Sequence, residues 1–136
     1  METEIKTIRI LSTVWILAVF NYLYCDVVTT MDQNMLRQFL AGEVGGMKFT
    51  QGFLLGASVL VEIPIAMILL SRISNYRVNR FANLIAGAIM TIVQVSSLFF
   101  GSAPTAYYIF FSIIEISSTV FIFIYAWKWK PVMSAA

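Results

Sequence analysis

The sequence predicts an all-α membrane protein, a four-transmembrane-helix up-down bundle with a short interfacial helix between the first and second spans. Hydrophobic residues make up 60% of the 136 residues, charged residues make up 12%, and the mean hydropathy is +0.83. Four stretches are long and apolar enough to cross a bilayer, which takes about 20 helical residues. They are continuously apolar and lack the alternation of a barrel strand, so we expect helices.

The predicted spans lie in a single domain, 1–136, and cover residues 8–30, 51–71, 80–100 and 104–127. The first span could be a cleaved signal, but bulky Tyr24 stands before Cys25 where processing would need a small residue. We therefore expect a retained helix. The connections 72–79 and 101–103 are short, so consecutive helices should be antiparallel neighbours. Pro104 suits the first turn of the last helix.

The segment between the first two spans predicts a short amphipathic helix. Asp32 is a suitable N-cap, and Gly42 would end the helix. One side would carry Met35, Leu36, Phe39 and Leu40. We favour an amphipathic turn that lies in the interface over a functional lid. Gly45 and Gly46 would then give a flexible approach to Thr50, the predicted N-cap of the second span.

The distribution of basic residues predicts the orientation. One side of the membrane would hold seven of them, Lys6, Arg9, Arg72, Arg77, Arg80, Lys128 and Lys130, and the other only Arg37 and Lys48. Because basic residues concentrate on the cytoplasmic side, we expect a multi-pass protein of the cell membrane (plasma or inner) with both termini cytoplasmic. Trp127 and Trp129 fit an aromatic belt at that side. The net charge of +2 reflects this asymmetry, and we expect no nucleic-acid partner.

The composition excludes several kinds of chemistry. The chain has no histidine, which removes Ser-His-Asp and Cys-His catalysis and histidine-ligated metal sites. A lone Cys25 cannot form an internal disulfide, a Cys-x-x-Cys pair or a zinc ribbon. We expect no metal and no cofactor. Enzymatic activity stays open, although a non-enzymatic role is favoured.

Three acidic residues lie inside the predicted spans. Glu62 and Glu115 fall near the middle of the second and fourth spans, and Asp26 falls in the outer half of the first. A charged acidic residue at that depth costs about 2.5 to 3.5 kcal/mol on insertion scales, and no Lys or Arg lies at comparable depth. Ionisable residues inside a membrane are therefore candidates for function.

Each span carries a polar side that we expect to face inward around a hydrated or hydrogen-bonded centre. The four stripes are Asn21, Tyr22 and Asp26; Gln51, Ser58 and Glu62; Asn83, Gly87, Met90 and Gln94; and Tyr108, Ser112, Glu115, Ser118 and Thr119. The candidate ligand- or proton-binding residues are Glu62, Glu115, Asp26, Asn21, Tyr22, Gln94 and Ser112. For Asn21, Asn83 and Gln94, plain hydrogen bonding between helices is the favoured alternative.

Pro64 indicates that the expected polar site lies beside Glu62. It cannot donate to the Leu60 carbonyl, so the second helix should kink beside Glu62 and leave an acceptor free. Two carboxyls close together in low dielectric cannot both ionise easily. Our hypothesis is that Glu62 and Glu115 share a proton.

Several local runs resemble a known but uncharacterised family of small bacterial four-helix membrane proteins, a domain of unknown function. The runs are Asn21-Tyr22-Leu23-Tyr24 with Asp26, residues 51–57, residues 62–67, residues 76–80, residues 107–111 and residues 125–129. The resemblance covers nearly the whole chain and implies bacterial origin and a four-helix topology, with no catalytic residue. A looser similarity to DoxX-type proteins rests on architecture alone.

Three functions compete. The first is a small-molecule or proton/cation-coupled binding or transport bundle for a hydrophobic or cationic molecule, with carboxylates at the membrane midplane. The second is a non-catalytic accessory subunit of a larger membrane complex. The third is an isomerase-like enzyme acting on a lipid-soluble substrate. The strong charge bias argues for one orientation in the lipid bilayer, so a homo-oligomer would be parallel.

Overall fold

The computed structural model describes residues 2–101 and 103–131. It confirms an all-α architecture with helices long and apolar enough to span a membrane. The elements in chain order are α1 (Glu2–Met31), α2 (Gln33–Leu40), β1 (Glu43–Val44), β2 (Met47–Lys48), α3 (Gln51–Ile73), α4 (Tyr76–Ser97) and α5 (Ala106–Lys128). The four candidate spans are α1, α3, α4 and α5.

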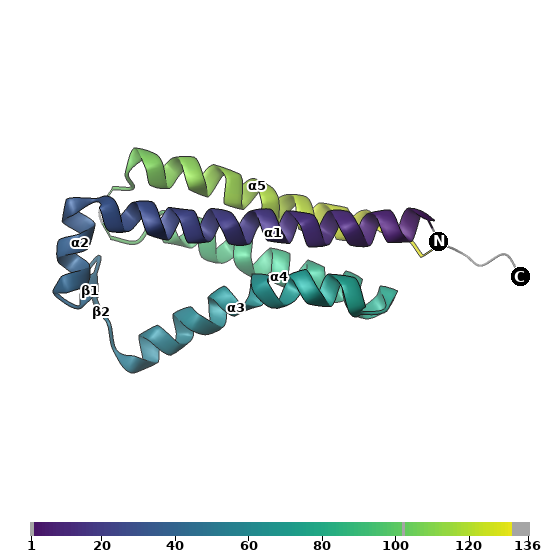
Figure 1. The fold of residues 1–136 in the computed structure, drawn as a ribbon, viewed down its shortest axis with the longest axis horizontal. Helices are drawn as coiled ribbons and strands as arrows, with labels where there is room; N and C mark the ends of the chain where they lie inside the picture. The colour runs from purple at the N-terminus through teal and green to yellow at the C-terminus, as the bar shows by residue number, and fades with distance from the viewer. Residues whose placement is uncertain (1, 102, 132–136) are drawn as a thin grey trace, which may run out of the picture.

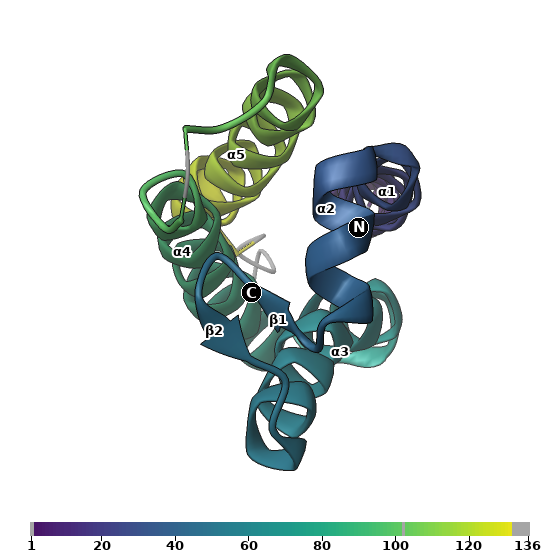
Figure 2. The ribbon, with the colours of Figure 1, turned by 90° about the vertical axis from the view of Figure 1, so that its left-hand side faces the viewer.

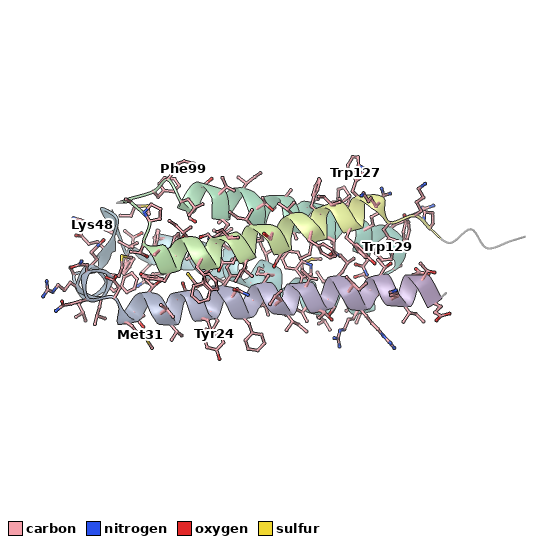
Figure 3. All side chains as sticks on the ribbon, turned by 90° about the horizontal axis from the view of Figure 1, so that it is seen from above. Tyr24, Met31, Lys48, Phe99, Trp127 and Trp129 are labelled. Carbon is pink, nitrogen blue, oxygen red and sulfur yellow. The ribbon has the colours of Figure 1, made fainter. Side chains whose placement is uncertain are left out.

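The four long helices form an up-down bundle. α1 packs on α3 and α5, and α4 packs on α5 and α3, so neighbours along the chain are mostly neighbours in space (Figure 2). α1 begins and α5 ends at one end of the bundle, which we name the terminal end; α2, the strands and the α4–α5 connection lie at the other, the loop end (Figure 1). Met31, Lys48 and Phe99 mark the loop end, and Trp127 and Trp129 lie toward the terminal end (Figure 3).

The helix boundaries differ from the predicted spans chiefly at the terminal end, where helices continue beyond the apolar stretches. α1 begins at Glu2 and α4 at Tyr76, several residues before the hydrophobic runs that marked them. Asn75 caps α4, its side chain accepting from the Val78 amide. The last span was expected to contain Pro104 in its first turn, but α5 begins at Ala106, with Thr105 at the N-cap position.

The segment between α1 and α3 contains the predicted short helix and an unpredicted hairpin. Asp32 caps α2 by accepting from the Asn34 and Met35 amides, which confirms the predicted N-cap. Thr50 likewise caps α3. β1 and β2 pair in antiparallel fashion around Gly45 and Gly46, both with positive φ, as a two-residue hairpin turn requires.

The amphipathic face of α2 is rotated from its predicted position. Met35 and Phe39 are half-buried, as expected, but Leu36 is exposed and Leu40 is 81% exposed. Gln38 is half-buried instead, because its side-chain oxygen accepts from the Gly45 amide at 2.8 Å. The tip of the hairpin reaches the α4–α5 connection, where a Cβ on Gly45 would meet the Gly101 Cα at 3.2 Å. The hairpin therefore packs against the α4–α5 connection through two glycines.

A buried hydrogen-bond network around Asn83 joins three helices in the terminal half of the bundle. The Asn83 side chain is fully buried and accepts from the Trp15 indole Nε1 at 2.7 Å. Its amide nitrogen donates to the Asn79 Oδ1 at 2.7 Å and to the Ser71 Oγ at 3.2 Å. Asn79 in turn donates to the Ser71 carbonyl at 2.6 Å. The network fulfils the structural expectation for Asn83, and it holds α1, α3 and α4 together.

Arginine and tyrosine side chains at the terminal end extend these contacts to α5. Arg80 donates to the Ala126 carbonyl at 3.1 Å and to the Trp127 carbonyl at 3.0 Å. The Tyr76 hydroxyl donates to the Trp129 carbonyl at 2.8 Å. Because these carbonyls belong to the last turn of α5 and the residue after it, Arg80 and Tyr76 satisfy a helix C-terminus, and Arg80 is also one of the basic residues that mark topology.

α3 bends away from the other helices in its loop-end half (Figure 1). Pro64 lies inside the helix and is buried, and a proline there removes one backbone hydrogen bond and kinks the helix. From Gln51 to Glu62 every residue is exposed except Phe53 and Leu60, which are half-buried. The expected kink is therefore accompanied by separation of half a helix from the bundle.

The Asn83 network predicts a large and specific loss of stability in Asn83→Leu. Leucine has a similar volume but leaves the Trp15 indole and the Asn79 side chain without their shared partner, and each buried group left unpaired costs about 1 to 3 kcal/mol. We expect the free energy of unfolding in mixed micelles to fall by about 2 kcal/mol or more. Asn21→Leu is the matched control, because the Asn21 amide donates within its own helix to the Leu17 carbonyl. Equal losses in the two variants would contradict a structural role for the network.

Candidate functional site

Glu115 is the buried carboxyl of the bundle. It is 1% exposed and lies on α5, on the same face as buried Ser112, Ser118 and Thr119. Its Oε1 atom is buried and has no hydrogen-bond partner. An ionised carboxylate in such surroundings would be uncompensated, so Glu115 is held in its neutral form or binds a group from outside the chain.

Tyr22 on α1 lies close to Glu115. Its hydroxyl is also buried and has no hydrogen-bond partner. Apart from these two, no buried side-chain nitrogen or oxygen atom in residues 2–101 and 103–131 lacks a partner. The two groups are close enough for the Glu115 charge to act on the Tyr22 hydroxyl. Buried polar groups in native proteins are nearly always paired, so two orphans in the same region point to a water or ligand between α1 and α5.

The other polar residues of this region are paired between α4 and α5. Gln94 donates to the Ser112 hydroxyl at 2.9 Å, and the Tyr108 hydroxyl donates to the Ser97 hydroxyl at 2.8 Å. Thr91 donates to the Thr119 hydroxyl at 2.8 Å. These bonds form a ladder along the contact between α4 and α5, the most extensive in the bundle. The Glu115 side chain takes part in none of them.

A cavity of about 380 Å³ lies at the loop end. It is open on one side and is bounded by the end of α1, α2, the hairpin, the α4–α5 connection and the start of α5. Side chains on its walls include Thr29, Met35, Gln38, Phe39, Phe49, Phe100, Tyr107 and Tyr108. Among the described residues that line it, Asp26 has the one carboxyl group. Asp26 is itself exposed and lies one helical turn from Tyr22 on α1, in the neighbourhood of Glu115.

The structure brings three of the seven sequence candidates together: Asp26, Tyr22 and Glu115. Gln94 and Ser112 bond to each other in the α4–α5 ladder beside them. Asn21 is half-buried and donates to its own helix. The remaining candidate, Glu62, lies elsewhere.

Glu62 does not face Glu115. The residues through which α3 packs on the bundle are Leu60, Pro64, Met67 and Ser71, which share one face of the helix. Glu62 is exposed on the opposite face, together with Gln51 and Ser58. The expectation that this stripe faces inward was wrong, and the proposed sharing of a proton between Glu62 and Glu115 within one chain has no structural basis. Helical periodicity identifies residues that share a face but does not determine which way the face turns.

Several cavity residues escaped the sequence analysis. Phe39 was assigned only to an interfacial face, and Gln38, Phe49 and Tyr107 had no assigned role in a site. The missed signal was the pair Gly45-Gly46 between two short polar-apolar segments, which is typical of a hairpin turn. The hairpin folds Phe49 back onto Phe39 of α2, with the two ring centroids 5.9 Å apart.

The acidic residues do not form a metal cluster within the described chain. No group of three or more Cys, Asp or Glu side chains lies close enough together there to hold a metal ion. Asp26, Glu115 and Tyr22 thus offer two carboxyls and a phenol, which suit a proton, a water or an organic cation.

Comparison with known proteins identifies the family. The sequence matches the profile of a family of unknown function, DUF6326, over residues 1–135. The chain belongs to DUF6326. This confirms the resemblance to a domain of unknown function, while the bacterial origin and the looser similarity to DoxX-type proteins stay predictions. No curated protein and no solved structure gives a match. The assignment of this DUF6326 protein to a function therefore depends on the site itself.

Glu115→Gln tests the state of the buried carboxyl. Because Glu115 is buried and no cationic side chain among the described residues pairs with it, we expect the protonated-carboxyl absorption in the wild-type infrared spectrum at pH 7 to decrease by one group in the variant. Glu43→Gln, a matched change in the hairpin, should remove only carboxylate absorption. Loss of carboxylate absorption in Glu115→Gln, with the protonated band retained, would show that Glu115 is ionised.

Proposed function

We propose that this DUF6326 protein binds a lipophilic cation in the loop-end cavity and that Glu115 releases a proton when the cation binds. The observation that carries the proposal is the single carboxyl group of Asp26 in a cavity whose walls are largely aromatic and apolar. The unpaired Glu115 and Tyr22 beside it supply the polar groups for proton exchange.

The lining of the cavity favours an organic cation over a neutral or anionic molecule. Phe39, Phe49, Phe100 and Tyr108 offer aromatic faces, which attract a cation when water is excluded. Asp26 offers the opposite charge, and no Lys or Arg is found among the described lining residues. Ligand sites commonly combine apolar walls with one or two polar groups that set orientation and specificity.

The proximity of Asp26 and Glu115 supports coupling to a proton. Two carboxyl groups in one low-dielectric region do not readily ionise together, so a charged Asp26 would favour a protonated Glu115. A cation beside Asp26 would offset that repulsion and favour release of the Glu115 proton. The proton could pass by way of the Tyr22 hydroxyl or a water in the same space.

The orientation of the protein in the membrane completes the proposal. Four apolar helices indicate a membrane-embedded protein. The seven basic residues at the terminal end, against two at the loop end, favour a cytoplasmic terminal end. The cavity would then open on the outer side of the cell membrane, where a lipophilic cation arrives from the outer leaflet.

Asp26→Asn is expected to weaken binding of tetraphenylphosphonium about tenfold or more, because a buried cation loses its opposite charge. The measurement is equilibrium dialysis with the purified protein in detergent. Glu43→Gln, which removes a carboxyl at the same end outside the cavity, should bind as the wild type does. Triphenylphosphine oxide, a neutral analogue, should lose little affinity in Asp26→Asn. Equal loss for both ligands would indicate that the variant alters the cavity shape, and unchanged cation affinity would refute the proposal.

A separate experiment tests whether Glu115 is the source of the released proton. In weakly buffered solution, tetraphenylphosphonium should release protons from the wild-type protein, and Glu115→Gln should bind the cation without that release. The same release from wild type and Glu115→Gln would assign the proton to another group.

A further inference from the structure

The outward face of α3 carries a seam that the single chain leaves uncovered. Glu62 is the central residue of α3 and is exposed, at the depth where an ionisable side chain is least compatible with lipid. Gln51 and Ser58 are exposed on the same face. By contrast, the strongly exposed side chains of α4 between Phe81 and Phe99 are apolar, as lipid contact requires. Polarity on the α3 face therefore calls for a protein partner.

The exposed residues on this face follow a heptad pattern. The seam consists of Gln51, Leu55, Ser58, Glu62, Ile65 and Leu69, separated alternately by four and three residues, and all six are exposed. Such spacing keeps one side of a helix against a neighbouring helix along its length, as at the a and d positions of a coiled coil. The seam lies opposite the face of Pro64, Met67 and Ser71, which packs on the bundle.

We propose that this seam is the interface between two copies of the chain, which associate in parallel through α3. In a parallel two-fold pair, each seam residue meets its own equivalent, so every polar member has to pair with itself. Glutamine and serine donate and accept at once, and so does a protonated glutamate. No Lys or Arg interrupts the seam, so the two Glu62 carboxyls are the one pair of ionisable side chains that would meet across it.

The shape of α3 also leaves the seam open to a second helix. The bend at Pro64 moves the loop-end half of α3 away from its own bundle, which leaves that half accessible to a partner (Figure 1).

Cysteine cross-linking in membranes tests the interface. In a Cys25→Ser background, Gln51→Cys, Leu55→Cys and Ser58→Cys should each form a disulfide-linked dimer on mild oxidation, because each residue meets its equivalent. Ile89→Cys, on the exposed face of α4, is the matched control and should remain largely monomeric. Equal cross-linking at Ile89, or cross-linking of the α3 variants to a different protein in place of a dimer, would overturn the proposal.

Association of the otherwise native protein gives a second test that is independent of cysteine chemistry. Glu62→Leu removes a polar group that pairs across the interface and replaces it with a side chain that is compatible with lipid. It should weaken dimerisation in lipid about tenfold. The measurement is single-molecule photobleaching over a range of dilutions. Glu62→Gln, which can still pair with itself, should dimerise nearly as the wild type does. A monomeric wild-type protein, or equal association of wild type and Glu62→Leu, would refute the interface. Tetraphenylphosphonium binding depends on the loop-end cavity, not on the seam. A wild-type protein that does not bind the cation would therefore leave the dimerisation result unaffected.

Discussion

The requirement that a bilayer imposes on polar groups, that each find its partner within the protein, organises this structure. In the terminal half the requirement is met by the Asn83 side chain, which bonds to Trp15, Ser71 and Asn79 at once. That network fixes the relative rotation of α1, α3 and α4. Among the described residues of the loop half, no equivalent network joins α1, α3 and α4, and it is there that α3 departs and a cavity forms.

Two glutamates of similar depth have different surroundings for this reason. Glu115 lies on a helix whose neighbouring polar residues bond to α4, and it is enclosed beside Tyr22 and Asp26. Glu62 lies on the helix that bends away, on the face opposite its packing residues. We propose proton release inside one chain for the first and recognition between chains for the second, because their environments differ.

Much of the architecture could be predicted from the residues alone. Hydropathy located the four spans, and Asp32 and Thr50 were recognisable as N-caps. The stripe of Asn83, Gly87, Met90 and Gln94 is buried as expected. The hairpin was missed although the Gly45-Gly46 pair is a local signal for a turn. The inward rotation of Gln38 was missed because it depends on a hydrogen bond from the Gly45 amide, which no local pattern encodes. Trp15, Ser71 and Asn79 were also missed, since their importance comes from meeting Asn83.

The sequence by itself determined the membrane class, the number of spans, the charge asymmetry and the set of residues that share each helical face. These properties depend on composition and on the 3.6-residue period of the helix. Only the tertiary structure decided which faces turn inward, and it placed Glu115 inside and Glu62 outside. The physical reason is that the rotation of each helix about its own axis is chosen by side-chain packing and by hydrogen bonds between helices, which join residues far apart along the chain.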